Sequence, residues 1–128
     1  MRLEFGLVCE DVRFEVGGKI SIIGESNLFQ LPKIPLTIPF CVVTKWSGSA
    51  GSKGLITLQM VSPDSLVPVV MAEQDLTLGE IEFDTSFGGT VNKLPWQFQT
   101  TGVHTVQIQL DGEERGRVEL LIKRLGPG

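Results

Sequence analysis

The chain has 128 residues, of which 41% are hydrophobic and 20% charged, and its formal net charge is −4. These proportions are typical of a globular domain and exclude a disordered or fibrous chain. No apolar run approaches the roughly 20 residues that a membrane-spanning helix needs, so we expect no membrane span. Residues 65–128 carry five basic and nine acidic groups, and without a basic cluster we expect no nucleic-acid partner.

The N-terminal residues predict an intracellular protein. Glu4 and Gly6 interrupt the stretch that would have to be the apolar part of a secretory signal. Cys9 and Cys41, in a chain of this length without such a signal, are typical of free thiols. We therefore expect a cytoplasmic protein that contains no disulfide.

The first part of the chain predicts strands that lead into a tight hairpin. Apolar residues alternate with others through residues 2–16, as in half-buried strands, with a corner expected at Glu10-Asp11. Gly17-Gly18 supplies the two positive-φ positions of a hairpin turn, and residues 19–23 form the returning strand. Pro32, Pro35 and Pro39 then interrupt the chain, so we expect at most a short edge strand at residues 28–31.

The middle of the chain alternates between strands and segments of loop composition. Residues 40–46 are apolar on both faces, which indicates a strand central to a two-layer core. Residues 47–54 and 84–93 have the Gly, Ser and Thr content of long loops. Further strands are expected at residues 55–61, 67–72, 75–78 and 80–83.

The C-terminal part predicts a second hairpin. Residues 103–110 and 117–124 alternate and flank a turn at Asp111-Gly112, after a short strand at 96–99. No window of a dozen residues has helical periodicity without Pro or Gly inside it. Eight or nine short strands without helices predict an all-β fold, a single antiparallel β-sandwich domain over residues 1–128.

The segment LPWQFQTTGVHTVQIQLDGEE, residues 94–114, resembles the end of many immunoglobulin-like or C2-like sandwiches. In that pattern an aromatic residue, a Gly before a strand and a closing Asp-Gly build the last hairpin. The position two residues after the Gly is commonly a corner tyrosine. Here it is His104, and the chain contains no Tyr.

The opening LEFGLVCEDVRFEVGGKISIIGES resembles the start of a small family of uncharacterised bacterial proteins. Their members begin with a Leu/Val-Cys-Asp-Asp-Val-Arg-like stretch followed by Gly-Lys and an Ile-Gly pair. The match covers residues 7–24, and Glu10 departs from the usual Asp. The resemblance implies a β-sandwich of about this size and implies no reaction.

Three residues are candidates for catalysis. His104 is the only histidine, so any triad or His-dependent acid–base scheme needs it, and its parity places it on the inward face beside Val106. Cys9 shares a predicted face with Leu3, Phe5 and Leu7, where apolar surroundings raise the pKa of a thiol. We therefore interpret His104, Cys9 and Cys41 as core residues and expect no enzyme.

The acidic residues are candidates for metal or sugar chemistry. Asp11, Asp64, Asp84 and Asp111 all fall in predicted turns, where C2-like sandwiches can bind calcium, but no Asp-x-Asp pair is present. Two Cys and one His cannot build a zinc site unaided. Glu80, Glu82 and Asp84 share a strand face, an arrangement that glycosidases can use and that a solvated sheet face explains more simply. We expect no metal and no cofactor.

The candidates for surface binding are Asp11, Arg13 and Trp96, the first two on the outward side of the first hairpin and the third beside a predicted loop. The sequence thus favours a non-catalytic module that binds a protein partner or assembles with itself. The alternative is a C2-like module that binds a ligand or calcium through its end-loop acids.

Overall fold

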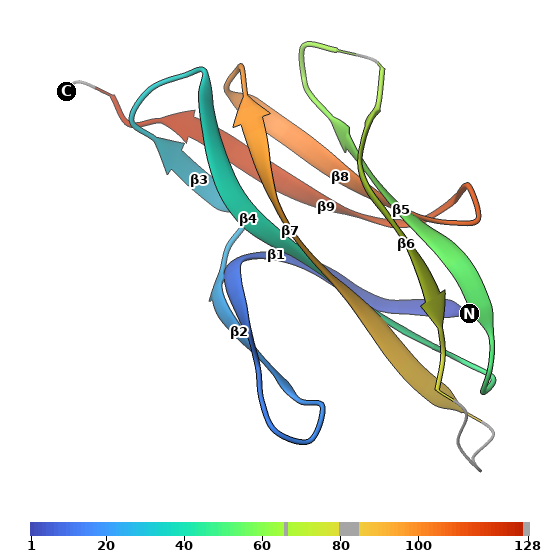
Figure 1. Cartoon of the computed structure of the whole chain (residues 1–128). Helices are drawn as coiled ribbons and strands as arrows, with labels where there is room; N and C mark the ends of the chain where they lie inside the picture. Colours follow the sequence, from blue (N-terminus) through green and yellow to red (C-terminus); the bar gives the residue numbers. More distant parts are fainter. Residues whose placement is uncertain (66, 80–84, 127–128) are drawn as a thin grey trace.

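The computed structural model describes residues 1–65, 67–79 and 85–126, and these form nine β-strands and no helix (Figure 1). An apolar helix long enough to cross a membrane is accordingly not found among the described residues. The strands are β1 (Arg2–Phe14), β2 (Ile20–Glu25), β3 (Leu28–Leu31), β4 (Leu36–Gly48), β5 (Lys53–Val61), β6 (Val69–Thr77), β7 (Ser86–Phe98), β8 (Gly102–Leu110) and β9 (Glu113–Arg124).

The strands form two sheets, which we call sheet A and sheet B. Sheet A has the order β2-β1-β4-β7, and sheet B has the order β3-β9-β8-β5-β6. Every pairing is antiparallel except that of β3 with β9, so the expectation of a wholly antiparallel sandwich is wrong at this edge. The cause is the crossover at Asn27, where the chain leaves sheet A: its side chain donates to the Glu119 carbonyl at 2.7 Å and its own carbonyl accepts from Leu121 N at 2.7 Å.

Strand β4 is the centre of sheet A. It pairs with β7 along its full length, from Leu36 to Gly48, and with β1 from Cys41 to Ser47. Its residues from Phe40 to Thr44 are all buried, on both faces of the sheet, as the sequence predicts for a central strand. One face of β4 contributes to the main core and the other to a second, smaller cluster.

The main core lies between the two sheets. Sheet A contributes large side chains such as Phe40, Trp46 and Phe98, and sheet B contributes alternating aliphatic residues of β5, β8 and β9. The indole N–H of Trp46 donates to the Thr44 hydroxyl at 2.8 Å, and the Thr44 hydroxyl contacts that of Thr90. The one polar group of this large side chain is therefore satisfied where water is excluded.

The second core lies on the outer face of sheet A. A register irregularity between Leu3 and Phe5 shifts the alternation of β1, so that Leu3 and Val8 pack in the main core. Cys9 is fully buried on the outer face with Cys41 and Val43. The prediction that Cys9 is buried is confirmed, and Phe5, Leu7 and Cys9 share one face as expected. The assignment of Leu3 to that face is wrong, because the bulge reverses the parity after it. Leu7, Val12 and Val91 complete this cluster.

Both predicted hairpins are confirmed. Strands β1 and β2 meet at Gly17 and Gly18, whose φ angles are 86° and 77°, and β8 and β9 meet at Asp111 and Gly112, whose φ angles are 50° and 83°. Glycine reaches this left-handed region without steric cost, and aspartate tolerates it. The first hairpin projects beyond the sheet layers (Figure 1).

Several predicted loops are strands. Residues 86–93 belong to β7, so the loop expected at 84–93 is wrong from residue 86 on. Glycine there allows β7 to approach β4 closely, because a Cβ at Gly89 would lie 2.6 Å from the Thr44 carbonyl oxygen of β4. The loop expected at 47–54 shrinks to residues 49–52, Pro39 lies inside β4, and the strands expected at 67–72 and 75–78 are the single strand β6. The strand expected at 80–83 lies outside the described residues.

The Trp46–Thr44–Thr90 contacts give a testable consequence for stability. Thr44→Val keeps the shape but leaves the indole N–H unpaired in the core, so we expect the free energy of unfolding to fall by about 1–3 kcal/mol. Thr90→Val is the matched control, since Thr44 can still accept the indole hydrogen bond, and its loss should be smaller. Urea titration followed by Trp fluorescence measures both, and equal losses would contradict the assignment.

Candidate functional site

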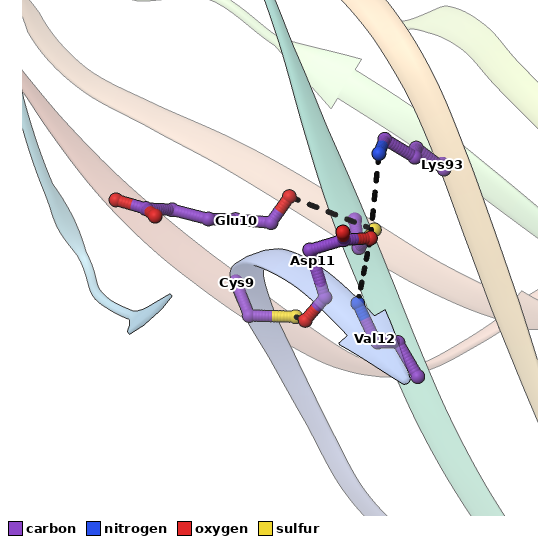
Figure 2. A network of polar contacts seen from close by, with 6 residues as sticks. Cys9, Glu10, Asp11, Val12 and Lys93 are labelled. Atoms are coloured by element: carbon purple, nitrogen blue, oxygen red, sulfur yellow. Dashed lines mark hydrogen bonds and ion pairs between the residues drawn. The ribbon is translucent and has the colours of Figure 1, made fainter. Parts of the chain in front are cut away.

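Asp11 is held by two partners at the turn of β1 toward the hairpin. Its Oδ1 accepts from Val12 N at 2.9 Å and lies 3.3 Å from Lys93 Nζ of β7 (Figure 2). The Val12 N–H and then the Lys93 ammonium lower the pKa of this carboxyl, with a smaller contribution from the charge of Arg13. The Asp11–Lys93 ion pair links β1 to β7. Because both side chains are exposed to solvent, the pair contributes little to the stability of the fold.

Of the other two surface candidates, Arg13 acts on Asp11 only through its charge, and Trp96 packs elsewhere. Arg13 is exposed on β1, and the ion pair of Asp11 is made by Lys93 instead of Arg13. Trp96 is half-buried opposite Ile38 of β4 and packs against the main core. The structure therefore does not gather Asp11, Arg13 and Trp96 into one surface.

Cys9 and Cys41 face each other across β1 and β4 as directly paired residues. Both are free and fully buried. The Cys9 thiol contacts the Asp11 carbonyl at 3.4 Å and the Cys41 thiol contacts the Glu10 carbonyl at 3.9 Å, the latter drawn in Figure 2. Burial raises the pKa of both thiols, which disfavours the nucleophilic thiolate.

His104 is buried at the start of β8, as expected. Its Nδ1 lies 3.2 Å from the Gly102 carbonyl, and its ring stands edge-on to Phe98 with centroids 5.1 Å apart. Burial lowers the pKa of the imidazole. Cys9 and Cys41 lie in the second core on the outer face of sheet A, whereas His104 belongs to sheet B, so neither thiol is a neighbour of the histidine.

The acidic candidates that the structure describes do not form a cluster. Asp11 is engaged by Lys93, and the Asp111 carboxylate accepts from Leu55 N at 2.9 Å. Within residues 1–65, 67–79 and 85–126, no three His, Cys, Asp or Glu side chains are grouped as a metal site requires. Glu80, Glu82 and Asp84 lie outside the described residues, so the interpretation of their shared face stays a prediction.

A cleft on the outer face of sheet A is the feature that sequence reasoning missed. The β1–β2 hairpin forms one wall, through Phe14, Ile20 and Ile22, and the sheet forms the other, through Phe5 and Phe87. The cleft has a volume of about 760 Å³. Phe14 and Phe87 are 72% and 56% exposed, so two large aromatic side chains border an open groove. Alternation along each strand could not reveal it, because its walls come from separate elements.

The charged residues that line the cleft are basic. Lys19 and Lys45 line it, and its described lining residues include no Asp or Glu. The Lys45 ammonium lies 5.2 Å from the centroid of the Phe87 ring, a cation–π contact that holds the charge over the apolar wall. In a chain with a net charge of −4, this cleft is a locally basic and apolar surface.

A family of unknown function, DUF6941, matches residues 4–123. The chain belongs to this family. The match spans nearly all described strands, from β1 to β9, and agrees with the expected membership of an uncharacterised family. No curated protein matches the chain.

Parts of two solved enzymes are similar in fold to this DUF6941 protein. A β-glucosidase from Listeria innocua in complex with glucose superimposes with a TM-score of 0.51 at 14% identity over 76% of this chain. The alkylpurine DNA glycosylase AlkC of Pseudomonas fluorescens superimposes with a TM-score of 0.50 at 13% identity, also over 76%. The chain spans 15% of the glucosidase and 27% of the glycosylase, so the likeness concerns one part of each and shows the fold alone.

The burial of both thiols predicts that they react slowly with disulfide reagents in the folded protein. We expect Cys9 and Cys41 to react with a water-soluble disulfide reagent far more slowly in buffer than in urea, because the thiolate is disfavoured and covered. Cys9→Ala and Cys41→Ala, measured in the same way, assign the two rates. Rapid reaction of either thiol in the folded protein would contradict this burial.

The lowered pKa of His104 predicts that acid weakens the fold. The unfolded imidazole, with a pKa of about 6.5, takes up its proton before the folded one does. The stability that the neutral, buried His104 contributes is therefore complete above about pH 6.5. It is lost as the pH falls toward the lower pKa of His104 in the folded protein. We expect the free energy of unfolding to decline below about pH 6.5. His104→Phe, which keeps a ring against Phe98, should flatten this decline, and an unchanged slope would assign it to other groups.

Proposed function

We propose that this DUF6941 protein is a non-catalytic module that binds an extended segment of a partner protein in the cleft between the β1–β2 hairpin and sheet A. The observation that carries the proposal is the open aromatic groove itself. Solvent-exposed aromatic side chains gathered in a concave surface are typical of protein contact sites. Phe14 and Phe87, on opposite walls, are positioned to hold such a segment from both sides.

The charges of the cleft indicate the chemistry of the segment. Lys19 and Lys45 provide positive charge beside apolar walls, and no described lining residue is acidic. Complementary charge favours encounter with the right partner and disfavours the wrong one. We infer that the segment combines aliphatic or aromatic side chains with acidic ones.

The burial of the reactive side chains supports a binding role over catalysis. Cys9 is covered in the second core with a raised pKa, and His104 is covered in the main core with a lowered pKa. Neither is a lining residue of the cleft. We further infer an immunoglobulin-like or C2-like arrangement of one sandwich domain, and a cytoplasmic location, which the two free thiols favour.

Two synthetic peptides test the proposal directly. One alternates aliphatic and acidic residues, and the other has the same aliphatic residues with Lys in place of the acids. We expect the acidic peptide alone to bind when measured by fluorescence anisotropy. Phe14→Ser should weaken its binding about tenfold or more, since aromatic anchors dominate such contacts. Lys45→Glu should weaken it and raise the affinity of the basic peptide.

Two matched variants serve as controls. Val103→Ser removes an exposed apolar side chain from β8, and Lys123→Glu reverses a charge on β9, both in sheet B and away from the cleft. Neither should change the affinity of the peptide. Equal binding of the two peptides, or equal effects of Phe14→Ser and Val103→Ser, would show that the cleft is not the contact surface.

A further inference from the structure

The free edge of β2 is an unprotected strand edge. β2 is the outermost strand of sheet A, and all six of its residues are exposed. Residues 20–23 read Ile-Ser-Ile-Ile, with no charge and no Pro. Natural proteins usually protect an exposed edge with charge, Pro or a bulge, because unpaired backbone groups on an apolar strand recruit another strand.

The other outer strands differ from β2 in this respect. β7 includes Pro95, β6 includes Glu73 and Asp75, and β3 has only four residues. β2 is thus the outer strand of more than four residues whose central residues are all uncharged and able to donate a backbone hydrogen bond. This difference singles it out for edge-to-edge pairing.

The register of the hairpin shows which backbone groups point to the free edge. Glu15 N donates to the Lys19 carbonyl at 2.8 Å, which makes these two residues a hydrogen-bonded pair. The pairs then alternate along the ladder, so Arg13 and Ser21 bond to each other while Ile20 and Ile22 face their partners without such bonds. The N–H and C=O groups of Ile20 and Ile22 are therefore directed away from β1, toward the free edge.

The charges at the two ends of β2 make this edge complementary to itself. Lys19 precedes the strand and Glu25 ends it, at equal distances in sequence from Ile22. A second copy laid antiparallel about Ile22 places its Glu25 opposite Lys19, and symmetry repeats this contact at the other end. Opposite charges directly across an antiparallel pair are favourable, and like charges are not. A two-fold interface of this kind closes on itself, as in most homo-oligomers.

We propose that two copies of this chain pair through β2, antiparallel and centred on Ile22, to form a homodimer with a continuous sheet. The proposal goes beyond the cleft, because it uses the backbone edge of β2 while the side chains of Ile20 and Ile22 line the cleft wall. The pairing involves few residues, well below the roughly 800 Å² per partner of a standard interface. The dimer therefore dissociates on dilution.

Charge reversal provides the decisive experiment, with sedimentation velocity over a wide range of concentrations as the readout. Lys19→Glu should raise the dimer dissociation constant about tenfold, because it sets Glu opposite Glu at both ends. The double variant Lys19→Glu/Glu25→Lys should restore dimerisation. Lys19→Glu also brings Glu15 and residue 19 into repulsion within the hairpin, and the double variant keeps that repulsion, so restoration reports only the contact between copies.

A backbone variant provides an independent test. Ile22→Pro removes an N–H that points to the free edge, so it should abolish the dimer with little change in melting temperature. Ile23→Pro is the control: it removes an N–H directed to β1 and should lower the melting temperature. A wild-type protein that is monomeric at every concentration, or a double variant that stays monomeric, overturns the proposal.

The outcome separates this proposal from the proposed function. A dimer that is lost in Phe14→Ser but retained in Lys19→Glu and Ile22→Pro would show that the copies meet across the cleft, which overturns pairing through β2. Binding of the acidic peptide by a strictly monomeric protein would refute the dimer and leave the cleft proposal standing. A β2-paired dimer that does not bind the acidic peptide would refute the cleft proposal and leave the dimer proposal standing.

Discussion

The two-sided burial of β4 is the constraint on which the rest of the structure depends. A strand that pairs on both edges and is buried on both faces from Phe40 to Thr44 needs cover on each side of its sheet. Sheet B covers one side and forms the main core, because its β5, β8 and β9 present regular alternating aliphatic residues. Among the described residues no second sheet covers the other side, and its apolar residues Cys41 and Val43 are covered by part of sheet A itself.

The β1–β2 hairpin supplies that cover. β1 pairs with β4 as far as Cys9 and from there on pairs with β2, so the strand changes partner without a break. The bulge after Leu3 turns Cys9 to the outer face, where Val12 closes the small cluster. The cover ends there, and beyond it the hairpin and the sheet stand apart with Phe14 and Phe87 exposed. The cleft thus follows from incomplete closure of the second core.

The sequence predicts what local chemistry decides and misses what tertiary placement decides. Gly17-Gly18 and Asp111-Gly112 identify both hairpins because few residues adopt positive φ, and the continuous apolar run identifies β4. Gly88 and Gly89 mislead, because the same residue that favours a loop also permits close strand approach. A one-residue bulge cannot be read from alternation, and it reverses the face of Cys9. The cleft is invisible to sequence reasoning, since Phe5, Phe14 and Phe87 become neighbours only in the folded sheet.

Apart from the Lys19 side chain, which lines the cleft and would also face Glu25 of the second copy, the two proposed contacts use different atoms of the same hairpin. The side chains of Ile20 and Ile22 turn toward the cleft, whereas their backbone groups turn toward the free edge. A strand can therefore pair with a second copy and still present the wall of its own cleft. Pairing about Ile22 would relate two clefts by a two-fold axis on one continuous sheet. A partner that carries two acidic, apolar segments would then gain from effective concentration, so that weak contacts at each cleft combine into firm binding. Dimerisation in this way would make the affinity for such a partner depend on the concentration of the module itself.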